Sequence, residues 1–270
     1  MAERKKYALV TGGGRGIGAA VALRLGKEGY NVAVTYRDSE SGAREVQQQL
    51  RAMGSDCGIF RADMSDLAQV NAAFDIYESR YAYLDLLVNN AGVTIGSPFL
   101  ETTPELFDAV VNTDLRGPYF MAQRAAKHMI ARNTEGSIIN ISSNQGTANF
   151  INYSVYGSIK AALTKLTKHM ALELAQHNIR VNALSPGLVD VFGMGGEAAK
   201  KYKTVIPLGH WAVPEQVAGI VAFLASDDAI YVTGEELIAD GGAKLPVMMD
   251  TPSSWIPESG RGESILTKRR

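Results

Sequence analysis

Short runs of hydrophobic residues alternate along the chain with longer segments in which hydrophobic positions recur at helical spacing. Short, almost wholly hydrophobic runs are typical of strands that are buried on both faces of a parallel sheet. The expected strands are residues 7–10, 31–36, 58–62, 84–88, 137–141, 180–184 and 235–239. The expected helices are residues 16–27, 44–53, 69–81, 104–132, 154–176 and 214–225. This order predicts an α/β fold: a seven-stranded, doubly wound parallel sheet with helices on both faces.

The length of 270 residues suits one α/β domain with a sizeable core. The alternating pattern stops after residue 242, where prolines begin to punctuate the chain. We therefore expect a single catalytic domain over residues 1–242 and a C-terminal extension over 243–270. That extension either packs on a neighbouring subunit or is disordered.

Composition and charge narrow the classes of partner. With a net charge of -1, the chain gives no reason to expect nucleic acid or an anionic membrane as a partner. Cys57 is the only cysteine, so the chain cannot form an internal disulfide, which is consistent with a reducing compartment. No signal peptide or membrane-spanning stretch is visible, and we expect a cytoplasmic protein.

A glycine-rich loop at residues 11–18 lies between the first expected strand and the first expected helix. Glycines let the backbone approach a pyrophosphate closely, and the helix N-terminus offers free N–H groups and the positive end of its dipole. In this position the loop predicts a dinucleotide site. The loop residues expected to contact the cofactor are Gly12, Arg15, Gly16, Ile17 and Gly18.

The end of the second expected strand indicates which dinucleotide is bound. An acidic residue usually stands there to accept bonds from the adenosine ribose hydroxyls, but this chain has Tyr36 followed by Arg37. Arg37 and Arg15 can pair with a 2′-phosphate, which favours NADP(H). Asp38 is the counter-argument, because it could turn inward to the ribose hydroxyls and bind NAD(H) instead.

Tyr156 and Lys160 are four residues apart in an expected helix, so their side chains share one face. Tyrosine is a poor acid or base at neutral pH until a neighbouring cation favours its phenolate. Lys160 can supply that cation, and the hydroxyl of Ser143 can hold a substrate oxygen beside the phenol. The spacing alone occurs often by chance, so its weight depends on the other motifs.

Those motifs resemble the short-chain dehydrogenase/reductase family in order and spacing from about residue 6 to 242. The shared positions are the 11–18 loop, Asp63, Asn89-Asn90-Ala91-Gly92, Ser143, Tyr156, Lys160, Pro186-Gly187 and Asp240-Gly241-Gly242. The segments 207–209 and 223–226 are most similar to the 3-oxoacyl-carrier-protein reductase and glucose dehydrogenase-like groups. The resemblance implies a Rossmann fold and a homodimer or homotetramer built by the helices expected at 104–132 and 154–176.

The resemblance also implies roles for individual residues. Tyr156 would exchange a proton with the reacting oxygen, Lys160 would hold the nicotinamide ribose and favour the phenolate, and Ser143 would hydrogen-bond the oxygen. Further cofactor contacts are expected from Tyr36, Arg37, Asp63, Met64, Asn90, Ala91, Gly92, Pro186, Gly187 and Val189. Substrate contacts are expected from Ser143, Asn144, Gln145, Tyr153 and Phe192, and no metal site is expected.

One position departs from the family pattern at the catalytic centre. An asparagine on the helix before the fifth strand normally holds a water that relays protons to the lysine, and the family spacing places Asp114 there. Asn112 is two residues away and should face elsewhere on a helix. A carboxylate can accept a bond from water but cannot donate one, and its charge favours protonated Lys160 while weakening the field of the lysine at Tyr156. We expect a working but retuned relay.

The expected function is an NADP(H)-dependent oxidoreductase that interconverts a secondary alcohol and a ketone, or oxidises a sugar at its anomeric carbon. Polar residues at 94, 144, 145, 149 and 153 favour a hydroxylated or polar carbonyl substrate, and residues 192–206 predict either a lid or a flexible connection. Two alternatives remain. One is a 3-oxoacyl thioester reductase of fatty-acid synthesis, and the other is a nucleotide-sensing protein with weakened catalysis.

Overall fold

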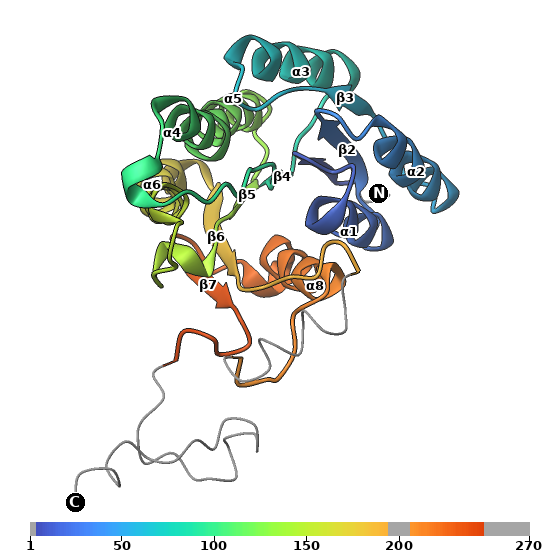
Figure 1. The fold of residues 1–270 in the computed structure, drawn as a ribbon. Helices are drawn as coiled ribbons and strands as arrows, with labels where there is room; N and C mark the ends of the chain where they lie inside the picture. Colours follow the sequence, from blue (N-terminus) through green and yellow to red (C-terminus); the bar gives the residue numbers. More distant parts are fainter. Residues whose placement is uncertain (1–3, 194–205, 246–270) are drawn as a thin grey trace, which may run out of the picture.

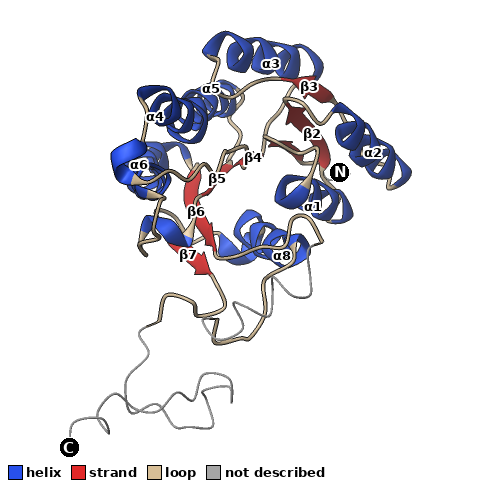
Figure 2. Ribbon diagram, viewed as in Figure 1, coloured by secondary structure: helices blue, strands red, loops and turns tan. Residues whose placement is uncertain are grey.

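The seven predicted strands form one parallel sheet in the computed structural model, which describes residues 4–193 and 206–245 (Figures 1 and 2). The strands are β1 (Tyr7–Val10), β2 (Asn31–Tyr36), β3 (Ile59–Arg61), β4 (Leu86–Asn89), β5 (Ser137–Ile141), β6 (Arg180–Pro186) and β7 (Glu236–Ala239). The order across the sheet is β3-β2-β1-β4-β5-β6-β7. The chain therefore winds outward from β1 to β3 and then returns to continue from β4 on the other side. This reversal places a crevice at the carboxyl ends of β1 and β4.

Helices cover both faces of the sheet, as the sequence predicted. They are α1 (Gly16–Lys27), α2 (Glu40–Ala52), α3 (Leu67–Arg80), α4 (Pro104–Val111), α5 (Gly117–Ala131), α6 (Ser154–Leu174) and α8 (Pro214–Ala225). Side chains of α1, α2 and α8 share one buried apolar cluster with the sheet, and those of α3, α5 and α6 share another. Figure 1 shows the sheet edge-on between these two groups of helices. The chain thus folds as a single α/β domain.

The strands are buried because apolar side chains point to both of these clusters. Every residue of β2, β4 and β5 is buried, which explains why the sequence shows continuous apolar runs rather than alternation. Within β5, Ile139 belongs to the cluster under α1 and α8, and its neighbour Ile138 belongs to the cluster under α3 and α5. Single substitutions in such a strand affect packing on one face only.

Element boundaries differ from the prediction where polar residues begin an element. Helix α2 starts at Glu40, four residues before the predicted start at 44, because Ala43 is the only hydrophobic residue among these four and one position shows no periodicity. Glu40 instead pairs with Arg44 at 2.6 Å, one turn later. Strand β4 starts at Leu86, since Leu84 of the predicted strand is buried in the preceding loop.

The predicted helix over 104–132 is present but is interrupted by a π-helical turn, Asn112–Arg116, between α4 and α5. Pro118 has no N–H to donate to the carbonyl four residues earlier, so the regular ladder cannot continue there. The N–H of Gly117 bonds to the carbonyl of Asn112, five residues back, which closes the wider turn. This wider turn changes the direction in which residue 114 projects.

Gly117 also lets this turn lie against the loop after β3. A Cβ atom at position 117 would overlap the carbonyl oxygen of Met64. We expect Gly117→Ala to lower the free energy of unfolding by about 1–3 kcal/mol in a denaturant titration, because the backbone must shift to relieve the overlap. Gly219→Ala on α8 is the matched control, since its nearest neighbour is a flexible arginine tip at 3.6 Å. An equal effect at both positions would contradict the proposed close contact.

Candidate active site

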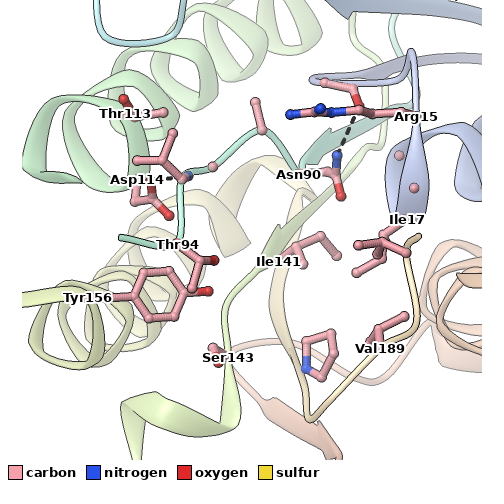
Figure 3. A pocket seen from close by; sticks show the side chains of 18 of the residues that line it. Arg15, Ile17, Asn90, Thr94, Thr113, Asp114, Ile141, Ser143, Tyr156 and Val189 are labelled. Atoms are coloured by element: carbon pink, nitrogen blue, oxygen red, sulfur yellow. Dashed lines mark hydrogen bonds between the residues drawn. The ribbon is translucent and has the colours of Figure 1, made fainter. Parts of the chain in front are cut away.

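The carboxyl ends of the strands surround a cavity of about 1000 Å³ (Figure 3). The loops that follow β1 to β6 all contribute to its wall. Figure 3 shows Arg15, Ile17 and Val189 on one side, with Asp114, Thr94 and Tyr156 on the other. The cavity therefore lies in the crevice that the strand order predicts. Of the expected site residues, all line it except Tyr153.

The glycine-rich loop has a backbone conformation that leaves room for a ligand close to it. Gly12 has φ +66°, a left-handed conformation that glycine adopts without strain. A Cβ at Gly18 would overlap the carbonyl oxygen of Gly12, so the first turn of α1 packs closely against the loop. Asn90, the residue after β4, holds the loop in place, because its side-chain amide donates to the carbonyl oxygens of Thr11 (2.9 Å) and Gly12 (3.3 Å). These residues fit a pyrophosphate bound at the N-terminus of α1.

The end of β2 presents a cation to the cavity. Arg37 and Asp38 both line it, and Arg37 Nε donates to Asp38 Oδ2 at 2.6 Å. Asp38 is thus paired with the neighbouring arginine at the wall of the cavity. Arg15 lines the same region. In the loop after β3, Asp63 Oδ1 accepts bonds from the N–H and hydroxyl of Ser65 (2.8 and 2.7 Å), which holds the loop that also carries Met64.

The predicted catalytic residues converge at the other end of the cavity. Tyr156 and Lys160 lie one turn apart on α6 and are both buried, with relative exposures of 8% and 4%. Lys160 Nζ lies 5.5 Å from the centroid of the Tyr156 ring and donates to the carbonyl oxygen of Ile141 at 3.0 Å. Ser143 follows β5, and its hydroxyl accepts a bond from Gln145 N at 3.2 Å, which orients it at the start of a short helix.

Asp114 contacts the lysine directly. Its Oδ2 lies 3.1 Å from Lys160 Nζ, and its side chain is completely buried. Its other oxygen accepts a hydrogen bond from Val93 N at 2.8 Å, which fixes the carboxylate against the loop after β4. A Cβ at Gly92 would overlap Oδ2, so this glycine makes room for the pair. A contact of this length leaves no space for a water between the two charged atoms. Asp114 therefore contacts Lys160 without an intervening water.

The buried pair determines the charge state of the lysine. Burial by itself lowers the pKa of Lys160, while the charges of Asp114 and of a Tyr156 phenolate raise it. The attraction outweighs the burial, and the pKa of Lys160 lies above its ordinary value. The ammonium therefore stays charged across the neutral range, beside both the phenol and the cavity.

The substrate end of the cavity differs from the polar pocket that the sequence suggested. Thr94, Asn144 and Gln145 line it, but the amide of Asn144 is directed to Asp240 Oδ2, 3.5 Å away. Tyr153 and Asn149 do not line the cavity, and Tyr153 instead lies edge-on to Tyr156 with ring centroids 6.5 Å apart. Ile95 and Phe150, which sequence patterns did not single out, complete the wall together with Val191 and the predicted Phe192. Most lie in loops, where no periodicity marks them.

Two further findings concern metal binding and membrane insertion. Within residues 4–193 and 206–245, no group of three or more His, Cys, Asp or Glu side chains could hold a metal ion. In the same ranges, no helix is both long and apolar enough to cross a membrane. Most of the lid segment predicted at 192–206, and residues 246–270 of the predicted C-terminal extension, lie outside the described residues.

Comparisons with known proteins agree with this geometry. A protein-family model described as enoyl-(acyl carrier protein) reductase matches residues 12–244. The 3beta-hydroxysteroid dehydrogenase 1 of Eggerthella lenta is 38% identical over 246 residues, which cover 89% of this chain and 94% of that protein. The chain belongs to the short-chain dehydrogenase/reductase family. As a member of this family it is an NAD(P)-dependent oxidoreductase that acts on hydroxyl and carbonyl groups.

Other members of the short-chain dehydrogenase/reductase family span different substrates. The 3-oxoacyl-(acyl-carrier-protein) reductase FabG of Staphylococcus aureus is 39% identical over 240 residues, covering 88% of this chain and 97% of that one. Acetoin dehydrogenase from Enterobacter cloacae superposes with a TM-score of 0.86 at 35% identity, covering 92% of this chain and 99% of that one. A blue fluorescent protein from a metagenomic library, in complex with NADPH, gives a TM-score of 0.84 at 35% identity, covering 88% and 98%.

The Asp114–Lys160 pair leads to a test by pH dependence. Asp114→Asn keeps an oxygen for Val93 N but removes the charge that partly cancels the field of Lys160 at the phenol. We expect turnover at neutral pH to be kept or raised. The acidic limb of the pH profile for alcohol oxidation should move to lower pH, because the phenolate forms more easily. The pKa of Lys160 should fall, since burial then acts against a weaker attraction.

The control for this variant is Asp108→Asn, which removes an exposed carboxylate from α4 and should leave the profile in place. An unmoved profile in Asp114→Asn would contradict the electrostatic role of the carboxylate. Loss of all activity with an intact fold, checked by circular dichroism, would show that the carboxylate has a specific role other than tuning.

Proposed function

We propose that this enzyme uses NADP(H) to interconvert a secondary alcohol and a ketone, with Tyr156 as the acid/base. The observation that supports this most strongly is the arrangement of Tyr156 beside a buried, charged Lys160, in the same cavity as the glycine-rich loop. When bound, the nicotinamide would donate hydride to the carbonyl carbon or accept it from the alcohol carbon.

Residues of the chain would bind the reacting oxygen of the substrate and exchange a proton with it. In the reducing direction, the Tyr156 hydroxyl gives its proton to the carbonyl oxygen as negative charge develops there. The hydroxyl of Ser143 donates a hydrogen bond to the same oxygen and stabilises that charge. Lys160 stabilises the phenolate that remains and offers donors to the ribose of the cofactor. In the oxidising direction each proton moves in the opposite sense.

The preference for NADP(H) rests on Arg15 and Arg37. Both line the cavity where the 2′-phosphate of a bound cofactor would lie, and an arginine fork suits a phosphate. Asp38, the residue that could accept ribose hydroxyls, is already engaged by Arg37 at 2.6 Å. The structural neighbour in complex with NADPH is consistent with this preference but belongs to a different protein.

The substrate class follows from the wall that is not occupied by the cofactor. Ile95, Phe150 and Phe192 give this end of the cavity an apolar surface beside its polar groups, which favours a ketone with an apolar body over a sugar. This replaces the polar substrate that the sequence favoured. A 3-oxoacyl thioester has the same combination of a carbonyl and an apolar chain, and the 39% identity to a reductase of that class keeps it as the second candidate.

Assembly into a homodimer or homotetramer in the cytoplasm is part of this proposal. Met121, Ala125 and Met129 of α5 are completely buried within the chain and so serve the core. Exposed apolar side chains for a subunit contact are present on the same helical layer at Phe107, Tyr119 and Leu172. Because these apolar side chains are exposed on the monomer, we expect a second subunit to cover them.

A cofactor-oxidation screen tests the reaction. We expect purified protein to oxidise NADPH with bulky apolar ketones or 3-oxoacyl thioesters, and more slowly with sugar-like carbonyls. Tyr156→Phe should lower kcat by about 10²–10⁴-fold, because the proton donor is lost. Tyr153→Phe, one turn earlier and outside the cavity wall, should retain most of the activity. Tight NADPH binding without turnover of any carbonyl class would favour the sensor alternative.

Cofactor choice is tested separately. Arg37→Gln should weaken NADPH binding about tenfold or more, with little change for NADH, because only the phosphorylated cofactor meets the missing charge. Arg61→Gln removes a cation of equal charge whose Nε lies 3.4 Å from the Arg37 carbonyl oxygen but which does not line the cavity. Its effect should be smaller. Equal weakening of both cofactors by Arg37→Gln, measured by fluorescence titration, would contradict the assignment.

A further inference from the structure

The substrate end of the active-site cavity meets solvent through a rim of apolar side chains. Ile95, Phe150 and Phe192 belong to the loops after β4, β5 and β6, and all three line the cavity. They are also exposed, with relative exposures of 36%, 39% and 72%. A side chain that lines a cavity and still reaches solvent to this extent lies near its mouth. We call these three residues the apolar rim.

The reacting groups lie deeper in the same cavity. Ser143 and Tyr156 line it as well, but each has a relative exposure of only 8%. The cavity is therefore polar at its base and apolar where it meets solvent. Because a carbonyl must approach Tyr156, the rest of the substrate extends toward the rim. An apolar body that covers the rim is bound more tightly in proportion to the area removed from water, and a hydrated body gains nothing there.

Two of the three rim loops are held together by contacts of their own. The N–H of Ser97 donates to the carbonyl oxygen of Asn152 at 2.7 Å. A Cβ atom at Gly96 would lie 3.1 Å from the ring of Tyr153, so the backbone of this loop rests on that ring. These contacts fix the spacing of Ile95 and Phe150 without a bound substrate. This side of the rim is therefore preformed, as is usual for small-molecule sites.

The charges at this end of the cavity favour a neutral substrate. Among the described residues that line the cavity, the only cation besides Arg15 and Arg37 is Lys160, which is paired with Asp114 at 3.1 Å. The neighbouring segment, from the short helix η1 (Phe99–Glu101) to the π-helical turn, exposes three carboxylates and one cation, namely Glu101, Glu105, Asp108 and Arg116. A substrate attached to a phosphate-bearing carrier would meet an excess of negative charge there.

We propose that the active site takes a neutral, lipophilic ketone whose apolar body extends out of the cavity and covers Ile95, Phe150 and Phe192. This inference rests on the proposed function, because it takes the substrate oxygen to lie between Ser143 and Tyr156. It also decides between the two substrate candidates. A carbonyl on a neutral apolar body is preferred to the same carbonyl on a thioester of a phosphate-bearing carrier.

The first test is a kinetic series with NADPH and the methyl ketones from 2-butanone to 2-nonanone. We expect kcat/KM to rise about two- to fourfold for each added methylene, mainly through KM, because each one covers more of the rim. A matched pair of thioesters tests the charge. The 3-oxohexanoyl thioester of N-acetylcysteamine, which is neutral, should have a higher kcat/KM than 3-oxohexanoyl coenzyme A.

The second test measures binding without turnover. Tyr156→Phe is saturated with NADPH and titrated with the same ketones, and the fluorescence of the bound NADPH reports binding. We expect Kd to fall about two- to fourfold per methylene, as in the kinetic series. This arm separates the inference from the reaction. Chain-length-dependent binding in a wild-type enzyme that reduces no carbonyl would sink the proposed reaction and leave the role of the rim standing.

Ile95→Ser and Phe150→Ser are the diagnostic variants for the rim. Both side chains are partly exposed, so the fold should be retained, which circular dichroism checks. Each variant should reduce the gain per methylene, so that its loss of affinity grows with the length of the ketone. Ile76→Ser is the matched control. It removes an equally apolar side chain, 50% exposed on α3 and absent from the cavity wall, and should leave the chain-length dependence in place.

Three results would overturn the inference. The first is a Kd in Tyr156→Phe that does not change with the length of the ketone, or no ketone binding at all. The second is a higher kcat/KM for the coenzyme A thioester than for its neutral counterpart. The third is an unchanged chain-length dependence in both rim variants together with a smaller assembly in size-exclusion chromatography, which would assign the rim to a contact between subunits.

Discussion

The catalytic end of this molecule is organised around the need to keep one buried lysine charged. An isolated ammonium inside a protein loses its hydration and would give up its proton, so it must be paired and hydrogen-bonded. Lys160 meets a carboxylate at 3.1 Å and a backbone carbonyl at 3.0 Å. These partners come from the turn between α4 and α5 and from the end of β5. One charge therefore holds together three elements that are far apart in the sequence.

The geometry of the Asp114–Lys160 pair depends on backbone features of residues that take no part in the reaction. Pro118 interrupts the helical ladder, and Gly117 closes a π-helical turn that carries Asp114 toward α6. Gly92 leaves the space that the carboxylate enters. A regular helix through 114, or a side chain at 92, would separate the two charges. The tuning of the acid/base group thus rests on residues that never contact a substrate.

Most of the fold could be predicted from the sequence because its strands are buried on both faces. A continuous apolar run between two helical segments, such as residues 31–36, is typical of a strand buried on both faces. Tyr156 and Lys160 could be placed together because helical spacing is short-range. The sequence failed where position depends on contacts between distant segments. It did not show the π-helical turn, the length of the contact between Asp114 and Lys160, or the absence of Tyr153 from the cavity wall.

An aspartate in place of the usual asparagine alters the balance at the catalytic centre in two opposing ways. Its charge secures the protonated state of Lys160, as the raised pKa of that group indicates. The same charge cancels part of the field that the lysine exerts on Tyr156 and on any cofactor ribose. A shared cation stabilises a phenolate less than an unshared one, so it leaves the phenol a weaker acid and the phenolate a stronger base. By this argument, the Asp114–Lys160 pair sets how readily the acid/base group exchanges its proton, and it acts on both directions of the reaction.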